Sequence, residues 1–199
     1  TVPARTSLRA AHAFLEEQRD WAEQALLRAR APGVLGLDAP GTIPVFGRPR
    51  PVRYAPATRS SVRRGAVLVA SGPTREAAAA ALERWAKREL LVHAERIVAA
   101  EAPRLGVAVP RLSVRAQRSR WGSASARTGT LALNWRLLLA SEAALDYVVV
   151  HELCHFLEMS HSPRFWRHVE AARPGFREPQ RWLRTHQAEL LRWSPLRAL

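Results

Sequence analysis

The chain of 199 residues is poor in cysteine, in lysine and in long apolar runs, and each shortage excludes a class of protein. Its one cysteine, Cys154, excludes a disulfide framework and a metal site built from several cysteines. It favours a reducing compartment, so we expect a cytoplasmic protein. No apolar run approaches the roughly 18–20 residues of a membrane span, and residues 1–6 lack the start of a signal peptide. We therefore expect no insertion into a membrane.

Basic residues are abundant, and almost all of them are arginine. The formal net charge is +14, and Lys87 is the one lysine among 31 basic residues. The surplus lies in residues 39–75 and 102–141, each with seven arginines and no acidic residue. A one-sided basic surface concentrates anions, which suggests a nucleotide or nucleic acid as a partner. The other interpretation is general solubility combined with codon usage.

The order of the predicted elements indicates an α+β fold. Apolar residues at helical spacing predict helices, and short apolar runs predict strands. The helices are expected over residues 7–30, 75–102 (stopped by Pro103), 142–159, 163–173 and 179–193, and the strands over 43–46, 51–54, 66–69, 112–116 and 130–134. Strands and helices do not alternate as in βαβ units. The stretch 31–44, rich in proline and glycine, predicts an N-terminal helical segment with a linker (residues 1–41), followed by a main unit (42–199).

The most specific motif is His151-Glu152-Leu153-Cys154-His155, which has the form H-E-x-x-H on a predicted helix. Residues i and i+4 lie on one helix face, so both imidazoles can meet a single Zn²⁺ ion. Glu152 lies about 100° around the helix from His151, where its carboxylate can reach a water on the metal. This spacing predicts a zinc site with Glu152 as general base.

A zinc site of this kind needs a third protein ligand, and His161 is the best candidate. A straight helix would place it about 15 Å from His151, so the helix must end near residues 159–160 and the chain must fold back. Glu158 stands where such motifs often have a glycine. The alternative third ligands are Glu158, Glu170 and His168.

Several segments together resemble the YgjP-like metallopeptidase domain. They are Gln117-Arg118-Ser119-Arg120-Trp121-Gly122-Ser123, Leu133-Asn134, the stretch 145–155 and His161-Ser162-Pro163-Arg164-Phe165-Trp166. The resemblance is close over residues 112–194 and looser back to residue 1. It implies a zincin-like α+β fold in which the metal helix packs under a small sheet, related to the SprT and WLM metalloproteases. It also implies that His151, His155 and His161 bind zinc and that Glu152 is catalytic. Ala124 replaces a cysteine that the family often has, so a role for that cysteine is absent here.

Arg118 and Arg120 are candidate substrate-binding residues, because in a strand they would share one face. There they could hold a carboxylate or phosphate, or stabilise an oxyanion. Alternatively they brace the metal helix through Asp146. Tyr147 could aid the transition state but is expected in the core, as are Cys154, Trp121, Trp166 and Trp182.

The sequence therefore predicts a zinc-dependent metallohydrolase acting on peptide or protein substrates. Glu152 would be the general base and a zinc-bound water the nucleophile. Two alternatives stay open. One is a metal-dependent hydrolase of nucleoside triphosphates or other phosphoanhydrides, and the other is a DNA-associated protease.

Overall fold

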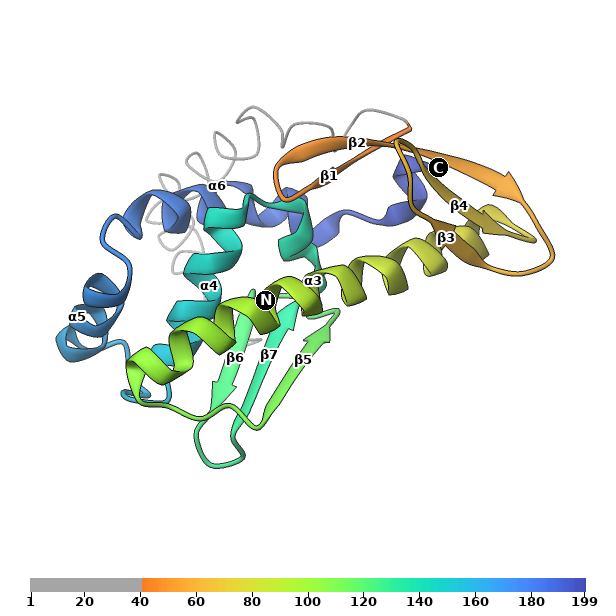
Figure 1. Ribbon diagram of the computed structural model, residues 1–199. Coiled ribbons are helices and arrows are strands. Elements are labelled where there is room, and N and C mark those ends of the chain that lie inside the picture. Colours follow the sequence, from red (N-terminus) through yellow and green to blue (C-terminus); the bar gives the residue numbers. More distant parts are fainter. Residues whose placement is uncertain (1–40) are drawn as a thin grey trace, which may run out of the picture.

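The computed structural model describes residues 41–199, which form a mixed α+β structure with two small sheets (Figure 1). The predicted α+β class is thus confirmed. The helix predicted over residues 7–30 lies outside the described residues, and the division into 1–41 and 42–199 stays a prediction. No helix within residues 41–199 has the length and apolarity needed to span a bilayer.

The first sheet comes from the arginine-rich segment and has the strand order β1-β2-β4-β3. Its strands are β1 (Thr42–Val45), β2 (Arg48–Pro56), β3 (Ser61–Arg63) and β4 (Leu68–Gly72). The first residues of β2 pair antiparallel with β1, and its last residues pair parallel with β4. Strand β3 then adds antiparallel to the free side of β4. Strand β3 is too short for a sequence pattern to predict it.

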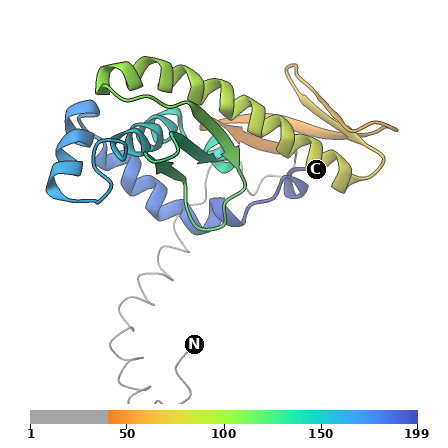
Figure 2. The same ribbon diagram turned by 90° about the horizontal axis from the view of Figure 1, so that it is seen from below.

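One long helix, α3 (Arg75–Leu105), runs across the molecule and packs against both sheets and the motif-bearing helix (Figures 1 and 2). It begins at Thr74, whose side-chain oxygen accepts a hydrogen bond from the Ala77 N–H at 3.2 Å. It ends at Gly106, which adopts a φ of 67° that favours glycine. The prediction that Pro103 stops this helix is wrong: the helix continues through Pro103 to Leu105, and Gly106 in its left-handed conformation ends it.

The second sheet carries one edge of the site described below. Its order is β5-β7-β6, with strands β5 (Arg111–Arg115), β6 (Gly122–Ser125) and β7 (Thr130–Asn134). Strand β6 pairs antiparallel with β7 and forms an edge of this sheet. The sequence did not predict β6, because Gly-Ser-Ala-Ser has none of the branched or aromatic residues typical of strands.

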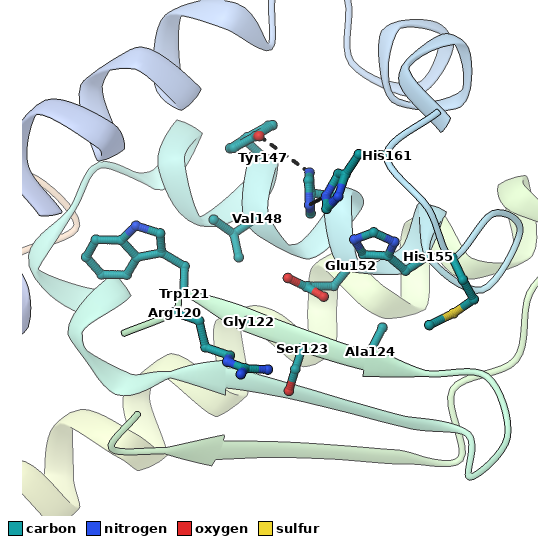
Figure 3. A pocket seen from close by; sticks show the side chains of 12 residues that line it. Arg120, Trp121, Gly122, Ser123, Ala124, Tyr147, Val148, Glu152, His155 and His161 are labelled. Carbon is teal, nitrogen blue, oxygen red and sulfur yellow. Dashed lines mark hydrogen bonds between the residues drawn. The ribbon is translucent and has the colours of Figure 1, made fainter. Parts of the chain in front are cut away.

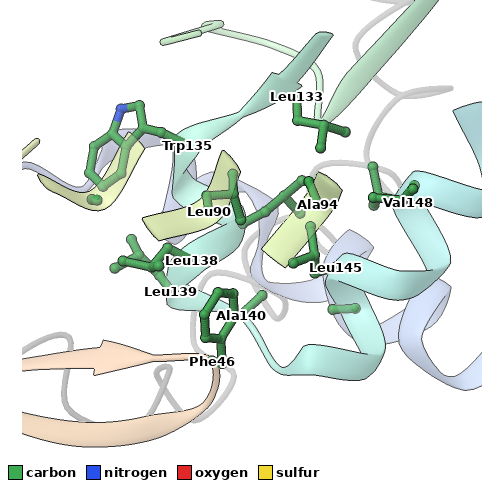
Figure 4. Close-up of a cluster of buried hydrophobic side chains, with 14 of the residues drawn as sticks. Phe46, Leu90, Ala94, Leu133, Trp135, Leu138, Leu139, Ala140, Leu145 and Val148 are labelled. Atoms are coloured by element: carbon green, nitrogen blue, oxygen red, sulfur yellow. The ribbon is translucent and has the colours of Figure 1, made fainter. Parts of the chain in front are cut away.

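The rest of the chain is helical: η1 (Trp135–Leu139), α4 (Glu142–Cys154), α5 (Pro163–Ala172), α6 (Arg177–Arg192) and η2 (Pro195–Ala198). Apolar side chains from α3, β7, η1 and α4 meet in one core (Figure 4). Leu90 and Ala94 of α3 are fully buried there, as is Leu133 of β7. Helix α4 is buried along most of its length, which fixes the positions of the motif residues near its end.

Candidate metal centre

The HExxH motif lies at the C-terminal end of α4, where the helix ends earlier than predicted. Helix α4 stops at Cys154 rather than near Met159. The N–H of Phe156 donates to the carbonyl of Leu153 at 3.0 Å, and that of Leu157 to the carbonyl of Cys154 at 3.0 Å. These bonds span three residues instead of four and tighten the chain into a turn. The turn brings His161 back to the motif, as the spacing argument requires.

Three imidazoles converge at this turn. The possible ligand atoms of His151, His155 and His161 all lie within 4.8 Å of one another. The Nε2 atoms of His151 and His161 are 3.1 Å apart. Within residues 41–199, no other group of three or more His, Cys, Asp or Glu side chains is arranged so that it could hold a metal ion. The structure thus brings together all three predicted metal ligands.

Hydrogen bonds and burial prepare two of the rings to bind a cation. The Nδ1 atom of His155 lies 3.2 Å from the carbonyl oxygen of Glu158, to which it can donate, leaving the Nε2 lone pair free. Burial, together with the neighbouring His155 and His161, lowers the pKa of His151 to about 3. The pKa of His155 is also lowered, mainly by burial. Neutral imidazoles in this arrangement fit a divalent transition metal ion.

Glu152 lies between the histidines and strand β6, in a cavity of about 490 Å³ (Figure 3). Its side chain is 6% exposed. Burial raises the pKa of Glu152 to about 7, and the Arg120 charge opposes that rise. A carboxyl group with this pKa can accept and release a proton near neutral pH.

Gly122 of β6 provides the space for this carboxyl group. A Cβ atom at position 122 would lie 2.6 Å from both Cγ and Oε1 of Glu152. Any side chain at this position would therefore displace the carboxyl group. The sequence analysis did not identify this close approach at Gly122, although a glycine within a strand often marks one.

Glu152 is expected to cost stability at neutral pH. Its pKa in the folded protein, about 7, lies above the ordinary value of 4.5, so deprotonation destabilises the fold as pH rises through this interval. We expect Glu152→Gln to stabilise the metal-free protein by up to about 3 kcal/mol above pH 7, with the gain vanishing near pH 4.5. Urea denaturation in the presence of a chelator, from pH 4.5 to 8, measures this. A gain that is the same at every pH would contradict it.

The loop over residues 117–121 brings Arg120 to the cavity. Buried Asn134 at the end of β7 donates through its side-chain nitrogen to the carbonyls of Gln117 (2.8 Å) and Arg120 (3.0 Å). Its own N–H donates to the carbonyl of Trp121. Sequence reasoning gave Asn134 no such role. A buried asparagine at the end of an apolar strand was the available signal, because buried polar groups are normally hydrogen-bonded.

Arg118 and Arg120 do not lie in a strand, which corrects one prediction. Both are in the irregular loop before β6, so the alternation of a strand does not place them on a common face. Arg120 lines the cavity, whereas Arg118 is not among its lining residues. The alternating pattern fails because Asn134 holds this segment in a non-extended shape.

Asp146 does brace the metal helix, but its partner is Arg173. The Arg173 guanidinium donates through Nε to Oδ2 of Asp146 and through a terminal nitrogen to Oδ1, the latter at 2.8 Å. The same group lies 3.1 Å from Oε1 of buried Glu101 on α3. These carboxylates raise the pKa of Arg173. Arg173, the residue that follows α5, is thus linked to both α3 and α4.

Tyr147 is a core residue, as predicted, and it also touches the site. It stacks on Phe176, and burial raises its pKa to about 12. Its hydroxyl lies 3.4 Å from Nδ1 of His151 (dashed line in Figure 3). A proton on Nδ1 can be donated to this oxygen, which leaves Nε2 of His151 facing the other histidines.

The alternative third ligands and the remaining residues considered in the sequence lie outside the group of three histidines. The Glu158 carboxylate accepts from the N–H and hydroxyl of Ser160, and so shapes the turn before His161. His168 and Glu170 lie on α5 outside the group of three. Cys154 is buried, and burial raises its pKa to about 11. Trp121, Trp166 and Trp182 pack against the core, as predicted.

Comparison with known proteins identifies the family of the chain. The model of the YgjP-like metallopeptidase domain matches residues 1–186. A comparison with curated proteins gives no match. A similar solved structure is that of the metallopeptidase zymogen of Pyrococcus abyssi abylysin, with 28% sequence identity, a TM-score of 0.43, and coverage of 47% of this chain and 95% of that one. On the family match over most of its length, the chain belongs to the YgjP-like metallopeptidase family.

Proposed function

We propose that the chain is a zinc peptidase in which His151, His155 and His161 hold the ion and Glu152 is the general base. Family membership makes it a metal-dependent, peptidase-type hydrolase of peptides or proteins. The proposal for zinc and for these residues is supported above all by one observation. Three imidazoles with ligand atoms within 4.8 Å of one another lie beside a buried carboxyl group. Imidazole is a preferred zinc ligand, and a site with three protein ligands leaves a position open for chemistry.

The residues of the chain would share the work of hydrolysis. A zinc ion here would act as a Lewis acid toward the scissile carbonyl and make water more acidic. Glu152 would accept the proton of the attacking water and pass it to the leaving amine, for which a pKa near neutrality is suited. Arg120 lines the same cavity and would stabilise negative charge developing on the substrate oxygen or bind a substrate carboxylate. Arg118 is left without a role at this cavity.

The substrate would bind as an extended peptide along β6. This strand pairs with β7 on one side, so the backbone groups of its other edge are free of that sheet. Residues 122–124 of β6 line the cavity that contains Glu152. An added peptide strand would satisfy the edge and carry a scissile bond past the carboxyl group.

The test is to load the purified protein with metal and to remove one ligand. We expect one equivalent of zinc per chain by elemental analysis, and casein hydrolysis that a chelator stops and zinc restores. The zinc content of the His161→Ala variant should fall well below one equivalent per chain, because the ion would lose one of three protein ligands. His186→Ala, which changes a histidine stacked on Trp182 of α6, is the matched control and should keep full occupancy. Full zinc content in His161→Ala would reject this ligand set.

The phosphoanhydride alternative receives no support from the family assignment, which names a metallopeptidase. Nucleoside triphosphates belong in the same assay as a comparison substrate. Hydrolysis of a nucleotide by the zinc-loaded protein, with casein left intact, would replace the peptidase proposal.

A further inference from the structure

The first sheet carries a second feature of the molecule, separate from the metal centre. Strands β2, β4 and β3 project beyond the first turns of α3, away from the small sheet that borders the site (Figure 2). Residues 41–75 include seven arginines and no acidic residue, and all seven arginines are exposed. They are Arg48, Arg50, Arg53, Arg59, Arg63, Arg64 and Arg75.

The strand register divides this sheet into an apolar and a basic face. Val52, Leu68 and Ala70 are buried on the face that packs against α3. On the opposite face, Arg53 of β2 and Arg63 of β3 both lie level with Val69 of β4. They are two strand spacings apart, about 10 Å, and point the same way. We call the surface formed by Arg53 and Arg63 the arginine face.

The arginine face lacks counter-charges within the described chain. Arg64 pairs with Glu89, Arg50 donates to the carbonyl of Gly65, and Arg75 lies over the Tyr54 ring. By contrast, Arg53, Arg59 and Arg63 make no ion pair with any residue from 41 to 199. Holding several like charges close together without partners is unfavourable, and an anionic ligand would relieve it.

The chemistry of this face selects among anionic partners. Guanidinium groups bind phosphate oxygens in a two-pronged geometry. The other residues on this side of the strands are Val69, which is only 7% exposed, and the small residues Ala55, Ser61 and Ser71. These strand positions offer no aromatic ring on which a base could stack, and their one larger apolar side chain, Val69, is buried and so could not enter a membrane. The ligand that fits this surface is a regular array of phosphate groups that approaches the sheet from the solvent.

We propose that the arginine face binds the phosphate backbone of duplex nucleic acid, without sequence preference and independently of the metal centre. Each arginine that neutralises a phosphate releases condensed counterions. The logarithm of the binding constant then falls by about 0.9 for each tenfold increase in salt and each contact.

The experiment compares the salt dependence of binding for three forms of the full chain. A fluorescent 20-base-pair DNA duplex is titrated by anisotropy at several salt concentrations in the presence of a chelator. We expect Arg53→Gln/Arg63→Gln to bind more weakly and to show a log–log slope shallower by about 2. Arg181→Gln/Arg184→Gln, which removes the same charge from exposed positions of α6, should bind like the unaltered chain. Unchanged melting temperatures show that both variants fold.

Three results would overturn the proposal. One is the absence of duplex binding at low salt. Another is an equal loss of affinity in the two double variants, which would indicate net charge rather than a defined face. The third is poly-glutamate competing as well as unlabelled duplex at matched charge, which would assign the face to acidic proteins. Loss of hydrolytic activity bears only on the metal centre, because this binding is measured without metal.

Discussion

Glu152→Gln is expected to reduce peptide hydrolysis by about a thousandfold while zinc content stays unchanged. The substitution keeps the size and hydrogen-bonding capacity of the side chain but removes its ability to accept a proton. Because Glu152 is not one of the three histidine ligands, the ion should remain in place. The measurement is kcat/KM on a peptide substrate together with metal analysis of the same sample.

A control on the same helix separates this effect from a general loss of charge. Glu142→Gln makes the same chemical change at the opposite end of α4 and should leave hydrolysis unaltered. Activity near that of the unaltered enzyme in Glu152→Gln would mean that another group takes the proton.

Gly122→Ala is expected to reduce hydrolysis about a hundredfold with little change in stability. The new methyl group would lie 2.6 Å from the Glu152 side chain, closer than such atoms can approach, so the carboxyl group must move. A displacement of about 1 Å in a catalytic group commonly costs two orders of magnitude in rate. Stability should change little because the atoms that must move belong to one side chain and not to the backbone. Kinetics and thermal denaturation of one preparation measure both effects.

Gly65→Ala is the matched control, since a Cβ atom there would meet only the Val67 carbonyl at an ordinary 3.6 Å. A double variant sharpens the test. If Gly122→Ala acts through the Glu152 carboxyl group, it should add almost nothing to the defect of Glu152→Gln. If the reduction in rate in the double variant equals the product of the two single reductions, Gly122 affects the reaction by a different route.

The sequence predicted the parts of the site that depend on local spacing. The four-residue separation of His151 and His155 determines a common helix face wherever a helix forms. The requirement that His161 return to that face then predicted a break in the helix. The predicted end of the helix was wrong by about a turn. The true end depends on backbone hydrogen bonds at Phe156 and Leu157 that no residue pattern indicates.

The parts that escaped prediction depend on contacts between distant segments. Strand β6 has weak strand propensity of its own and exists because β7 pairs with it. Arg173 was not identified as the partner of Asp146, which lies 27 residues earlier in the chain. The role of Gly122 becomes visible only when α4 lies against β6. Each of these depends on the packing of whole elements, which local periodicity does not specify.

The link from Glu101 through Arg173 to Asp146 has a consequence for the loop that carries His161. This loop leaves α4 and enters α5, and the two helices are fastened together at Asp146 and Arg173. A swing of α5 as a lid would have to break that link, which is also anchored to α3. We therefore expect substrate to enter and leave the centre through small movements of residues 156–162 rather than through movement of the helices on both sides.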